Sequence, residues 1–341
     1  MEKFDVVCAT DDNYAEYCAV MLCSLFENNL NMQITVHVLI ETLSSKNKDE
    51  LILLSQRYGQ TLLFYTVDTN KLKNVKYRSK NPLSSAAYYR ILLTSILPKT
   101  VNKVLYLDCD LLVLKSVREI FEVNLDGYAL AAVRDQENLP VNDEHRLQLN
   151  LPYKSSYFCS GVMLINLEYW RKCEAEEKLI EFACTERTVY FHDQDALNYL
   201  FWNKWFELSP KWNRFNLVAY DKKNFETFED EYNYIYDPSI LHFASPAKPW
   251  LKIHFVNWNR LYKKYYEICF KRKMIRKPFG KSKTIIYKKI LEVNLVNLIY
   301  RSPLFLSIFF VFVLNLLKFV ALILFRKNIF KAHFFSLKNI R

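Results

Sequence analysis

Glycine is scarce in this chain, with only 4 among 341 residues. This scarcity excludes both glycine-rich phosphate-binding loops, G-x-G-x-x-G and the P-loop, because each needs several glycines within a few residues. The 8 cysteines form no C-x-x-C pair, and several stand in apolar runs, as small buried hydrophobic residues do. The N-terminus lacks the apolar run of a signal peptide and carries acidic residues early. These features favour a reduced, cytosolic setting.

Charge is divided unevenly along the chain. The net charge of +11 combines −7 over residues 1–251 with +18 over residues 252–341. Such a basic C-terminal region suits an anionic partner, either nucleic acid or a membrane. Within it, residues 303–325 are apolar except for a few polar side chains and one charge, Lys318. Nucleic-acid-binding tails are not built this way, so we expect residues 271–341 to bind a membrane surface and no nucleic acid to bind.

The apolar stretch could span the membrane or lie in its interface. Basic residues flank it on both sides, whereas a single span would carry one basic flank across the membrane, against the positive-inside tendency. Ser307, Asn315 and Lys318 fall in one polar sector of a helix drawn at 100° per residue. We therefore expect a helix deep in the interface or a re-entrant one. A single C-terminal span and a buried core helix remain alternatives.

Strand and helix patterns alternate over the first 110 residues. Apolar runs predict strands at 4–9, 34–40, 61–67 and 104–107, and helical spacing predicts helices at 14–28, 44–58 and 84–97. We expect Ser44 or Ser45 to cap the second helix and Gly59 to end it. This alternation predicts an α/β fold with a Rossmann-like mixed, mostly parallel sheet flanked by helices.

The alternation of strand and helix patterns is weaker after residue 110. Short strands are expected at 129–133 and 162–165, and helices at 174–184 and 193–202. Residues 203–250 show no clear period and are interpreted as an aromatic-rich loop.

Two carboxylates, Asp108 and Asp110, follow the strand pattern at 104–107. Side chains at i and i+2 of a strand point the same way, and two unpaired charges cannot face an apolar core. We expect them to face a cleft and share a hard divalent cation, which could bind a diphosphate. Asp11 also follows a strand end and should lie in the same crevice. Acids that cap a turn are one alternative, and an Asp-nucleophile phosphatase motif is another, although Leu112 stands where that motif usually has Thr or Val.

Six segments occur in an order that is specific as a set. They read VVCATDDNY, AAYYRILL, KVLYLDCDLLVL, SGVMLINLEYWR, HDQDALN, and LHF followed by PAKPW. In these segments the chain resembles glycosyltransferase family 8, the retaining GT-A-fold transferases that include bacterial lipopolysaccharide galactosyl- and glucosyltransferases. The resemblance covers about residues 4–255. It implies a GT-A catalytic domain over residues 1–255. The charge and apolar pattern of the rest of the chain predict a basic, hydrophobic, helical membrane-associating region over residues 256–341.

The resemblance also implies an activity. The chain would be a UDP-sugar-dependent hexosyltransferase of EC 2.4.1 type that moves galactose or glucose to a lipid-linked or lipopolysaccharide-core saccharide. It would work at the cytoplasmic side of the inner membrane, as a peripheral or monotopic protein. An inactive nucleotide-sugar-binding or membrane scaffold protein and a metal-dependent phosphoesterase are the alternative interpretations of the sequence.

Site residues follow from the same resemblance. Asp108, Asp110 and His242 would bind Mn²⁺, with Mg²⁺ as a possible substitute, because an imidazole beside carboxylates favours Mn²⁺. Four residues would hold the uridine, with Asp11 accepting from the base and Tyr14 stacking on it: Ala9, Asp11, Asn13 and Tyr14. His242 as a core or loop histidine and Tyr14 as a core aromatic are the structural alternatives.

The sugar and diphosphate would be held by a second set of residues. Arg90 would contact the donor sugar or its phosphate, and Lys248 the diphosphate. Asp193 would bind donor-sugar hydroxyls, and Gln194 would lie near the anomeric carbon, as the two catalytic residues. The structural alternatives are a surface salt bridge for Arg90, a loop lysine for Lys248 and a helix N-cap for Asp193.

Two departures from the family pattern concern the donor. Cys159 and Ser160 belong to the donor-binding set, but Cys159 stands where the family often has Asn, which removes one hydrogen bond to the sugar. Ser245 stands at a common Gly. For the chemistry, Gln194 is a poor nucleophile, which favours front-face substitution with the leaving phosphate as base. Asp195 as a covalent nucleophile is the alternative, by analogy with retaining glycosidases.

Overall fold

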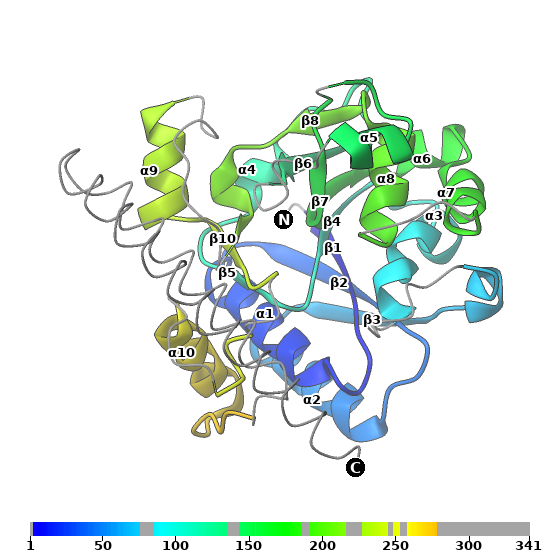
Figure 1. Cartoon of the computed structure of the whole chain (residues 1–341). Helices are drawn as coiled ribbons and strands as arrows, with labels where there is room; N and C mark the ends of the chain where they lie inside the picture. The colour runs from blue at the N-terminus through cyan, green and yellow to red at the C-terminus, as the bar shows by residue number, and fades with distance from the viewer. Residues whose placement is uncertain are drawn as a thin grey trace, which may run out of the picture. The chain divides into compact units, whose positions relative to one another are not determined.

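The computed structural model describes residues 3–75, 85–135, 143–153, 155–185, 191–215, 227–244, 248–252 and 258–277. The chain divides into two compact units, one of Met1–Asn216 with Lys223–Phe279 and the other of Leu217–Lys222 with Gly280–Arg341. All the described residues belong to the first unit, whose helices and strands are the coloured ribbons of Figure 1.

A seven-stranded sheet forms the centre of this unit, in the order β3-β2-β1-β4-β7-β6-β8. Its strands are β1 (Lys3–Ala9), β2 (Gln33–Ile40), β3 (Thr61–Thr66), β4 (Lys103–Leu107), β6 (Leu130–Arg134), β7 (Phe158–Asn166) and β8 (Trp205–Glu207). All adjacent pairs are parallel except those of β7, which runs antiparallel to both β4 and β6. The predicted mixed, mostly parallel α/β sheet is confirmed.

A second sheet has three short strands, in the order β5-β10-β9. These are β5 (Leu111–Val113), β9 (Arg214–Phe215) and β10 (Ile240–His242). Strand β10 pairs antiparallel with β5 and parallel with β9. Because β5 follows β4 after a three-residue turn, the second sheet is connected directly to the end of a central strand.

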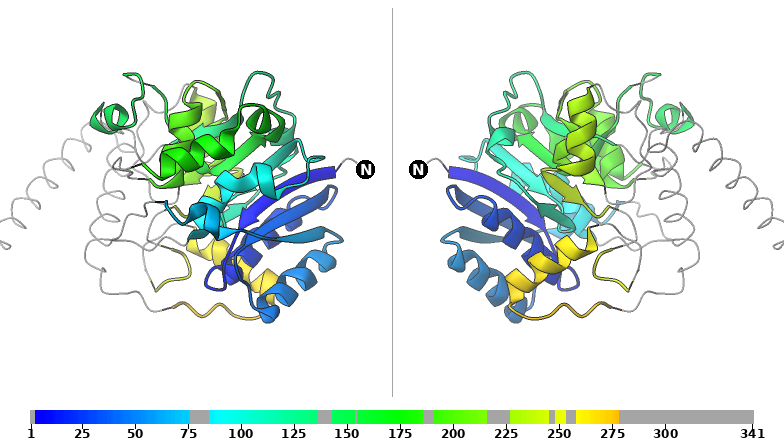
Figure 2. Two further views of the ribbon diagram at one scale, coloured as in Figure 1. Left: turned by 90° about the vertical axis from the view of Figure 1, so that its right-hand side faces the viewer. Right: turned by 90° about the vertical axis from the view of Figure 1, so that its left-hand side faces the viewer.

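Helices cover both faces of the large sheet (Figure 2). Adjacent strand residues face opposite cores: Val6 packs with the α1 side and Val7 with the side of the later helices. The helices are α1 (Ala15–Glu27), α2 (Ser45–Arg57), α3 (Leu93–Ile96), α4 (Arg118–Phe121), α5 (Asp143–Gln148), α6 (Leu167–Lys172), α7 (Ala175–Ala183), α8 (Asp193–Phe201), α9 (Phe228–Tyr236) and α10 (Asn259–Phe270), with 3₁₀ segments η1 (Thr69–Leu72), η2 (Ser85–Leu92) and η3 (Pro210–Trp212). Strands buried on both faces explain the continuous apolar runs of the sequence.

The helix-start prediction at Ser44 is confirmed, because its side chain accepts a hydrogen bond from the backbone N–H of Asn47. The expected helix at 84–97 is only partly correct: most of its described length is the 3₁₀ segment η2, followed by the short α3. Strand β7 spans Phe158–Asn166, so it extends beyond the predicted strand at 162–165 at both ends.

The prediction of a loop over residues 203–250 is wrong. This region holds β8, η3, β9, α9 and β10. Its strands are two or three residues long, too short to show an alternating pattern, so the sequence carries no periodic signal for them.

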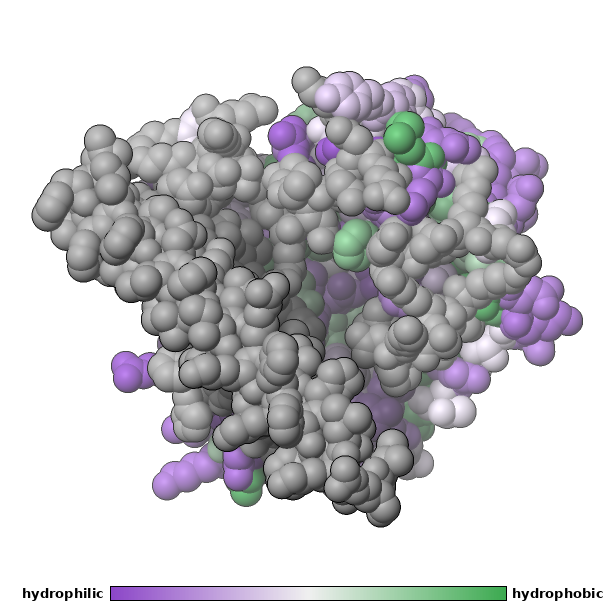
Figure 3. Space-filling model, in the orientation of Figure 1, coloured by the Kyte–Doolittle hydropathy of each residue, from purple (hydrophilic) through white to green (hydrophobic). Residues whose placement is uncertain are grey.

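Helix α10 packs on α1, and the Cys269 thiol contacts the Ala19 carbonyl at 3.4 Å. The domain boundary predicted between residues 255 and 256 stays a prediction. Residues 278–341, including the apolar stretch 303–325, lie outside the described residues. In the described part of the chain, no helix has the length and apolarity needed to cross a membrane. The described surface seen in Figure 3 is mainly hydrophilic, with isolated hydrophobic side chains.

Candidate active site

Asp108 and Asp110 lie in the turn between β4 and β5, just beyond the strand end rather than within the strand. Cys109 between them turns into the core, where its thiol donates to the Ala9 carbonyl at 3.1 Å. The backbone N–H of Asp108 donates to the Gly161 carbonyl at 2.9 Å, which ties the turn to β7. With the middle residue anchored inward, both carboxylates face away from the core, as the i and i+2 spacing predicted.

His242 ends β10 and lies beside this turn. Its Nε2 is 3.3 Å from Asp110 Oδ1 and 3.9 Å from Asp108 Oδ2. The cause is the second sheet, where His242 pairs with Leu111 and the Phe243 N–H donates to the Asp110 carbonyl at 2.9 Å. One ligand atom from each of Asp108, Asp110 and His242 lies within 4.8 Å of the others. The structure therefore brings together the three predicted metal ligands.

Two neighbours show that these residues fit a divalent ion. The buried Asn213 accepts a hydrogen bond from His242 Nδ1 at 2.9 Å, which leaves the Nε2 lone pair facing the carboxylates. A Cβ added at Gly161 would lie 2.4 Å from His242 Cε1 and 2.9 Å from Asp108 Oδ2, so only glycine leaves this space free. Two carboxylates and an imidazole form a donor set that suits Mn²⁺.

Lys248 contacts one of the two carboxylates, Asp110. Its Nζ donates to Asp110 Oδ2 and, at 2.6 Å, to the Phe243 carbonyl. Burial by itself would raise the pKa of Asp110, but the nearby Lys248 and His242 hold it below its usual range. Asp110 is therefore ionised, and Lys248 is a partly buried partner of this carboxylate rather than an ordinary loop lysine.

Arg90 connects the metal-ligand turn to the start of α8. It is 4% exposed, and its Nη2 donates to Asp108 at 2.8 Å while its Nε lies 3.0 Å from Asp193 Oδ2. Nη1 donates to the Ser160 carbonyl at 2.7 Å, and the guanidinium lies 4.3 Å from the centre of the Tyr106 ring. The alternative of a surface salt bridge is wrong because the pair is buried. Burial opposes the charge, yet Asp108 and Asp193 raise the pKa of Arg90, so it remains a cation.

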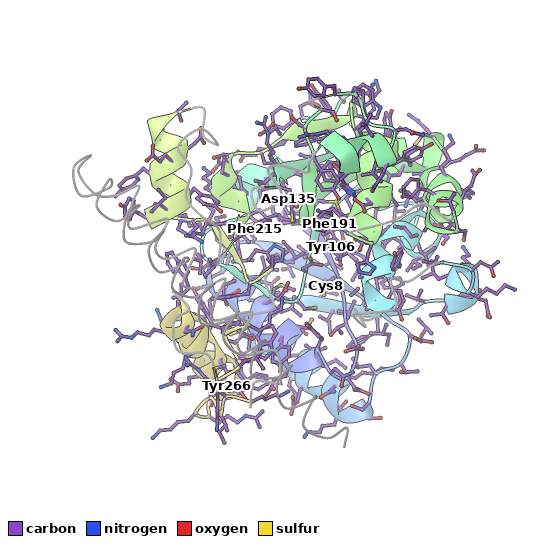
Figure 4. All side chains as sticks on the ribbon, in the orientation of Figure 1. Cys8, Tyr106, Asp135, Phe191, Phe215 and Tyr266 are labelled. Carbon is purple, nitrogen blue, oxygen red and sulfur yellow. The ribbon has the colours of Figure 1, made fainter. Side chains whose placement is uncertain are left out.

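Asp193 and Gln194 form the first turn of α8, and both are buried. Gln194 accepts from the Ser160 N–H and donates to Asp135, each at 2.9 Å, so its amide is held at both ends. Burial raises the pKa of Asp193 to about 6, with Arg90 opposing and Asp108 adding to the shift. At neutral pH a carboxyl group with that pKa is mostly ionised, so it mainly accepts hydrogen bonds from hydroxyl groups. Figure 4 labels Tyr106 of β4, Asp135, which follows β6, and Phe215 of β9.

The predicted uridine residues lie at the carboxyl end of β1, next to β4. Asp11 Oδ1 accepts from the backbone N–H groups of Asn13 and Tyr14, both at 2.9 Å, and so orders the start of α1. The Tyr14 ring meets Tyr17 and Trp250 edge to face, at centroid distances of 5.5 and 6.1 Å. Asn13 is exposed, and Ala9 is half-buried. Their contact with a base stays a prediction.

Cys159 and Ser245 are the two residues that depart from the family pattern. Cys159 is buried. Ser245 lies outside the described residues. Asp135 and Asn213 were not among the residues predicted from the sequence. The rule that polar residues at strand ends line the ligand site could have found Asp135, which follows β6. Asn213 precedes a two-residue strand and carries no such signal.

Comparisons with known proteins match the chain to one family. The sequence profile described as glycosyl transferase family 8 matches residues 5–254. The chain is 32% identical over 257 residues to general stress protein A of Bacillus subtilis (strain 168), over 73% of this chain and 88% of that protein. It is 29% identical over 255 residues to a lipopolysaccharide 1,2-glucosyltransferase of Escherichia coli, over 73% and 74% of the two chains. Its fold resembles the crystal structure of the galactosyltransferase LgtC in complex with donor and acceptor sugar analogs, with a TM-score of 0.68 and 24% identity over 78% of this chain and 96% of that one.

Proposed function

The chain belongs to glycosyltransferase family 8, and we propose that it transfers galactose or glucose from a UDP-sugar to a lipid-linked or lipopolysaccharide-core saccharide with retention of configuration. The observation that carries this proposal is the meeting of Asp108, Asp110 and His242 at the end of the central sheet. The choice of hexose and acceptor is supported by the name of one relative, an Escherichia coli lipopolysaccharide glucosyltransferase.

Asp108, Asp110 and His242 would hold Mn²⁺, with Mg²⁺ as a substitute. A bound divalent ion supplies positive charge that stabilises the diphosphate as it leaves. Lys248, already within reach of Asp110, would add a second positive charge to the diphosphate. Asp11 and Tyr14, at the end of the adjacent strand β1, would hold the uridine. With these roles, the UDP leaving group would lie over the ends of β1 and β4.

The sugar would lie toward Asp193 and Gln194. Asp193 would bind the sugar hydroxyls, and Arg90 holds its carboxyl group in place. Gln194 has an amide that is bonded at both ends and carries no charge, so it is a poor nucleophile. We therefore favour front-face substitution, in which the acceptor hydroxyl attacks the face from which UDP leaves and a phosphate oxygen takes its proton.

Hydrolysis of the donor tests the proposal without a known acceptor. UDP-glucose and UDP-galactose are incubated with the full chain and Mn²⁺, and UDP release is measured. We expect release with at least one sugar, its loss in EDTA, and a large loss in Asp110→Asn. The matched control is Asp126→Asn, an exposed acid in another loop, which should keep wild-type rates. Equal UDP release by wild type and Asp110→Asn would contradict the proposal.

For the C-terminal region, we propose binding to the cytoplasmic face of the inner membrane through residues 271–341. The support is its charge, with 20 basic against 2 acidic residues over 252–341, and the apolar stretch within it. Sedimentation with vesicles tests this proposal. The full chain should pellet with anionic vesicles and remain in solution with neutral ones at physiological salt. Equal pelleting with both would argue against the electrostatic part.

A further inference from the structure

A buried polar cluster surrounds Asp195, the residue that follows Gln194. The Asp195 side chain is fully buried. Its Oδ1 accepts hydrogen bonds from His145 Nε2 at 2.8 Å and from the Tyr157 hydroxyl at 2.7 Å. Its Oδ2 accepts from the backbone N–H of Phe191 at 2.9 Å. Such donors are needed because a buried carboxylate without them is costly.

The cluster joins three segments of the chain. His145 comes from α5, Tyr157 from the residue before β7, and Phe191 from the turn before α8. The three rings contact one another, with centroid distances of 5.6 Å for His145–Phe191, 6.1 Å for His145–Tyr157 and 6.2 Å for Tyr157–Phe191. The carboxylate therefore holds together segments that are far apart in sequence.

The turn that leads into α8 is strained at one residue. His192 has φ 54° and ψ −122°, a conformation that residues with a Cβ rarely adopt. Strain of this kind persists where neighbouring contacts hold it. His192 lies between Phe191 and Asp195 in the chain. The hydrogen bond from the Phe191 N–H to Asp195 therefore closes the turn that contains it and supplies such a contact.

The cluster adjoins the proposed catalytic residue. Asp195, which accepts from the Tyr157 hydroxyl, directly follows Gln194 in the first turn of α8. Burial raises the pKa of Tyr157 and Asp195 raises it further, so the hydroxyl stays protonated and acts as a donor. Gln194 in turn bonds Ser160 and Asp135. A shift of the α8 turn would therefore move Gln194 and Asp193 away from their partners.

We propose that Asp195, His145 and Tyr157 act as a positioning unit, which sets the place of Asp193 and Gln194 at the donor sugar. This inference rests on the proposed transferase function and deepens it. It also replaces the interpretation of Asp195 as a covalent nucleophile. A carboxylate with no exposed surface and with hydrogen bonds to both oxygens is not available to attack an anomeric carbon.

The chain contains a matched control for this unit. His37 Nε2 bonds Asp5 Oδ1 at 2.9 Å, and His37 Nδ1 lies 3.0 Å from the Tyr65 hydroxyl. This second His–Asp–Tyr set lies on strands β1, β2 and β3 and has no part in the proposed site. Disrupting either set should lower stability. Only disruption of the set around Asp195 should also lower the rate of catalysis.

Kinetics of UDP-sugar hydrolysis provide the first test. His145→Leu and Tyr157→Phe should lower kcat on the order of 10- to 100-fold with donor KM changed by no more than about threefold. His145→Gln, whose amide can donate to Asp195, should recover part of the loss. His37→Leu should lower the melting temperature but keep kcat within about twofold at temperatures well below it. Unchanged kcat in His145→Leu, or an equal loss in His37→Leu, would overturn the proposal.

Two further measurements separate this inference from the proposed function. Amide hydrogen exchange over residues 191–201 needs no turnover, and it should rise in His145→Leu and stay unchanged in His37→Leu. Unchanged exchange in His145→Leu would overturn the positioning role, even if no tested UDP-sugar is a substrate. Mass spectrometry of wild type mixed with a UDP-sugar should find no sugar bound to the peptide that carries Asp195. A glycosyl adduct there would overturn the assignment.

Discussion

Asn213 Oδ1 lies 2.9 Å from His242 Nδ1, and both side chains are buried. This bond selects the tautomer in which Nε2 is free to face Asp108 and Asp110. Partners of this kind orient a ligand and make it a better electron donor. The quality of the proposed metal site therefore depends on an asparagine 29 positions away in the chain.

Replacing Asn213 should weaken metal binding without removing a ligand. We expect Asn213→Ala to lower Mn²⁺ affinity by about 10- to 100-fold, measured by calorimetric titration in the presence of UDP. Asn29→Ala is the control, because Asn29 is equally buried and its Oδ1 accepts from the Val117 N–H at 2.9 Å. That variant should lose stability and keep its Mn²⁺ affinity. Affinities that agree within about twofold for Asn213→Ala and wild type would contradict the role of Asn213.

A methyl group at Gly161 should disturb the same site. The added Cβ would overlap His242 Cε1 and crowd Asp108, so Gly161→Ala should abolish Mn²⁺-dependent UDP binding. Thermal shift with UDP, in Mn²⁺ and in EDTA, measures this. Gly59→Ala is the control: it has open space for a Cβ but a φ of +65°, so it should cost about 1 kcal/mol of stability and keep the Mn²⁺-dependent shift. A full shift in Gly161→Ala would refute the predicted overlap.

Lys248 should affect the metal and the nucleotide in opposite directions. It neutralises Asp110 in the metal-free protein, so Lys248→Met should increase Mn²⁺ affinity in the absence of UDP. The same change removes a cation from the diphosphate site, and it should weaken UDP binding with Mn²⁺ by about 10- to 100-fold. Calorimetry of each ligand separates the two effects. Lys172→Met, which removes an exposed pair with Glu168, should change neither affinity. If Lys248→Met changed the Mn²⁺ affinity and the UDP affinity in the same direction, this would argue against the proposed role of Lys248.

Glu176 should make stability depend on pH. Burial alone would raise its pKa, but hydrogen bonds from Lys71, Thr94 and Ser95 lower it below the ordinary value. The ionised form is thus stabilised in the folded state. This contribution is complete above the unfolded pKa of about 4.5 and is lost as pH falls through the lower folded pKa.

The matching variant is Glu176→Gln. We expect it to lower the free energy of unfolding by about 1–3 kcal/mol near pH 7, and the gap to wild type should narrow below about pH 4.5. Urea unfolding at several pH values measures the gap. Glu168→Gln, in an exposed i,i+4 pair, should change stability by less than about 0.5 kcal/mol at every pH. If the difference in unfolding free energy between wild type and Glu176→Gln widened on acidification, the predicted direction of the pH dependence would be wrong.

Sequence patterns predicted the parts of the fold that are long and regular. Strands β1, β2 and β4 and helices α1 and α2 have clear periods and recognisable ends, such as the cap at Ser44, so they were found nearly to the residue. The prediction of a loop over residues 203–250 was wrong because β9 and β10 are defined by pairing with partners distant in sequence. Such short strands gain their stability from the sheet rather than from their own residues.

The site divides in the same way. The i and i+2 spacing of Asp108 and Asp110 predicted a shared direction, and the motif order identified His242 as their partner. The nearness of His242 to Asp110 required the second sheet. Arg90 was predicted to contact the donor, but its burial between Asp108 and Asp193 became visible only in three dimensions.

The sequence by itself determined the family, the alternation of strands and helices, and the identity of the three candidate metal-binding side chains, because these depend on residue type and local spacing. Tertiary structure alone decided that Asn213 orients His242 and that His145 and Tyr157 enclose Asp195. These pairs lie tens of residues apart, and no local propensity records which side chains will share a hydrogen bond after the sheet has formed. Most buried polar atoms have a hydrogen-bond partner, but only the folded chain selects which one.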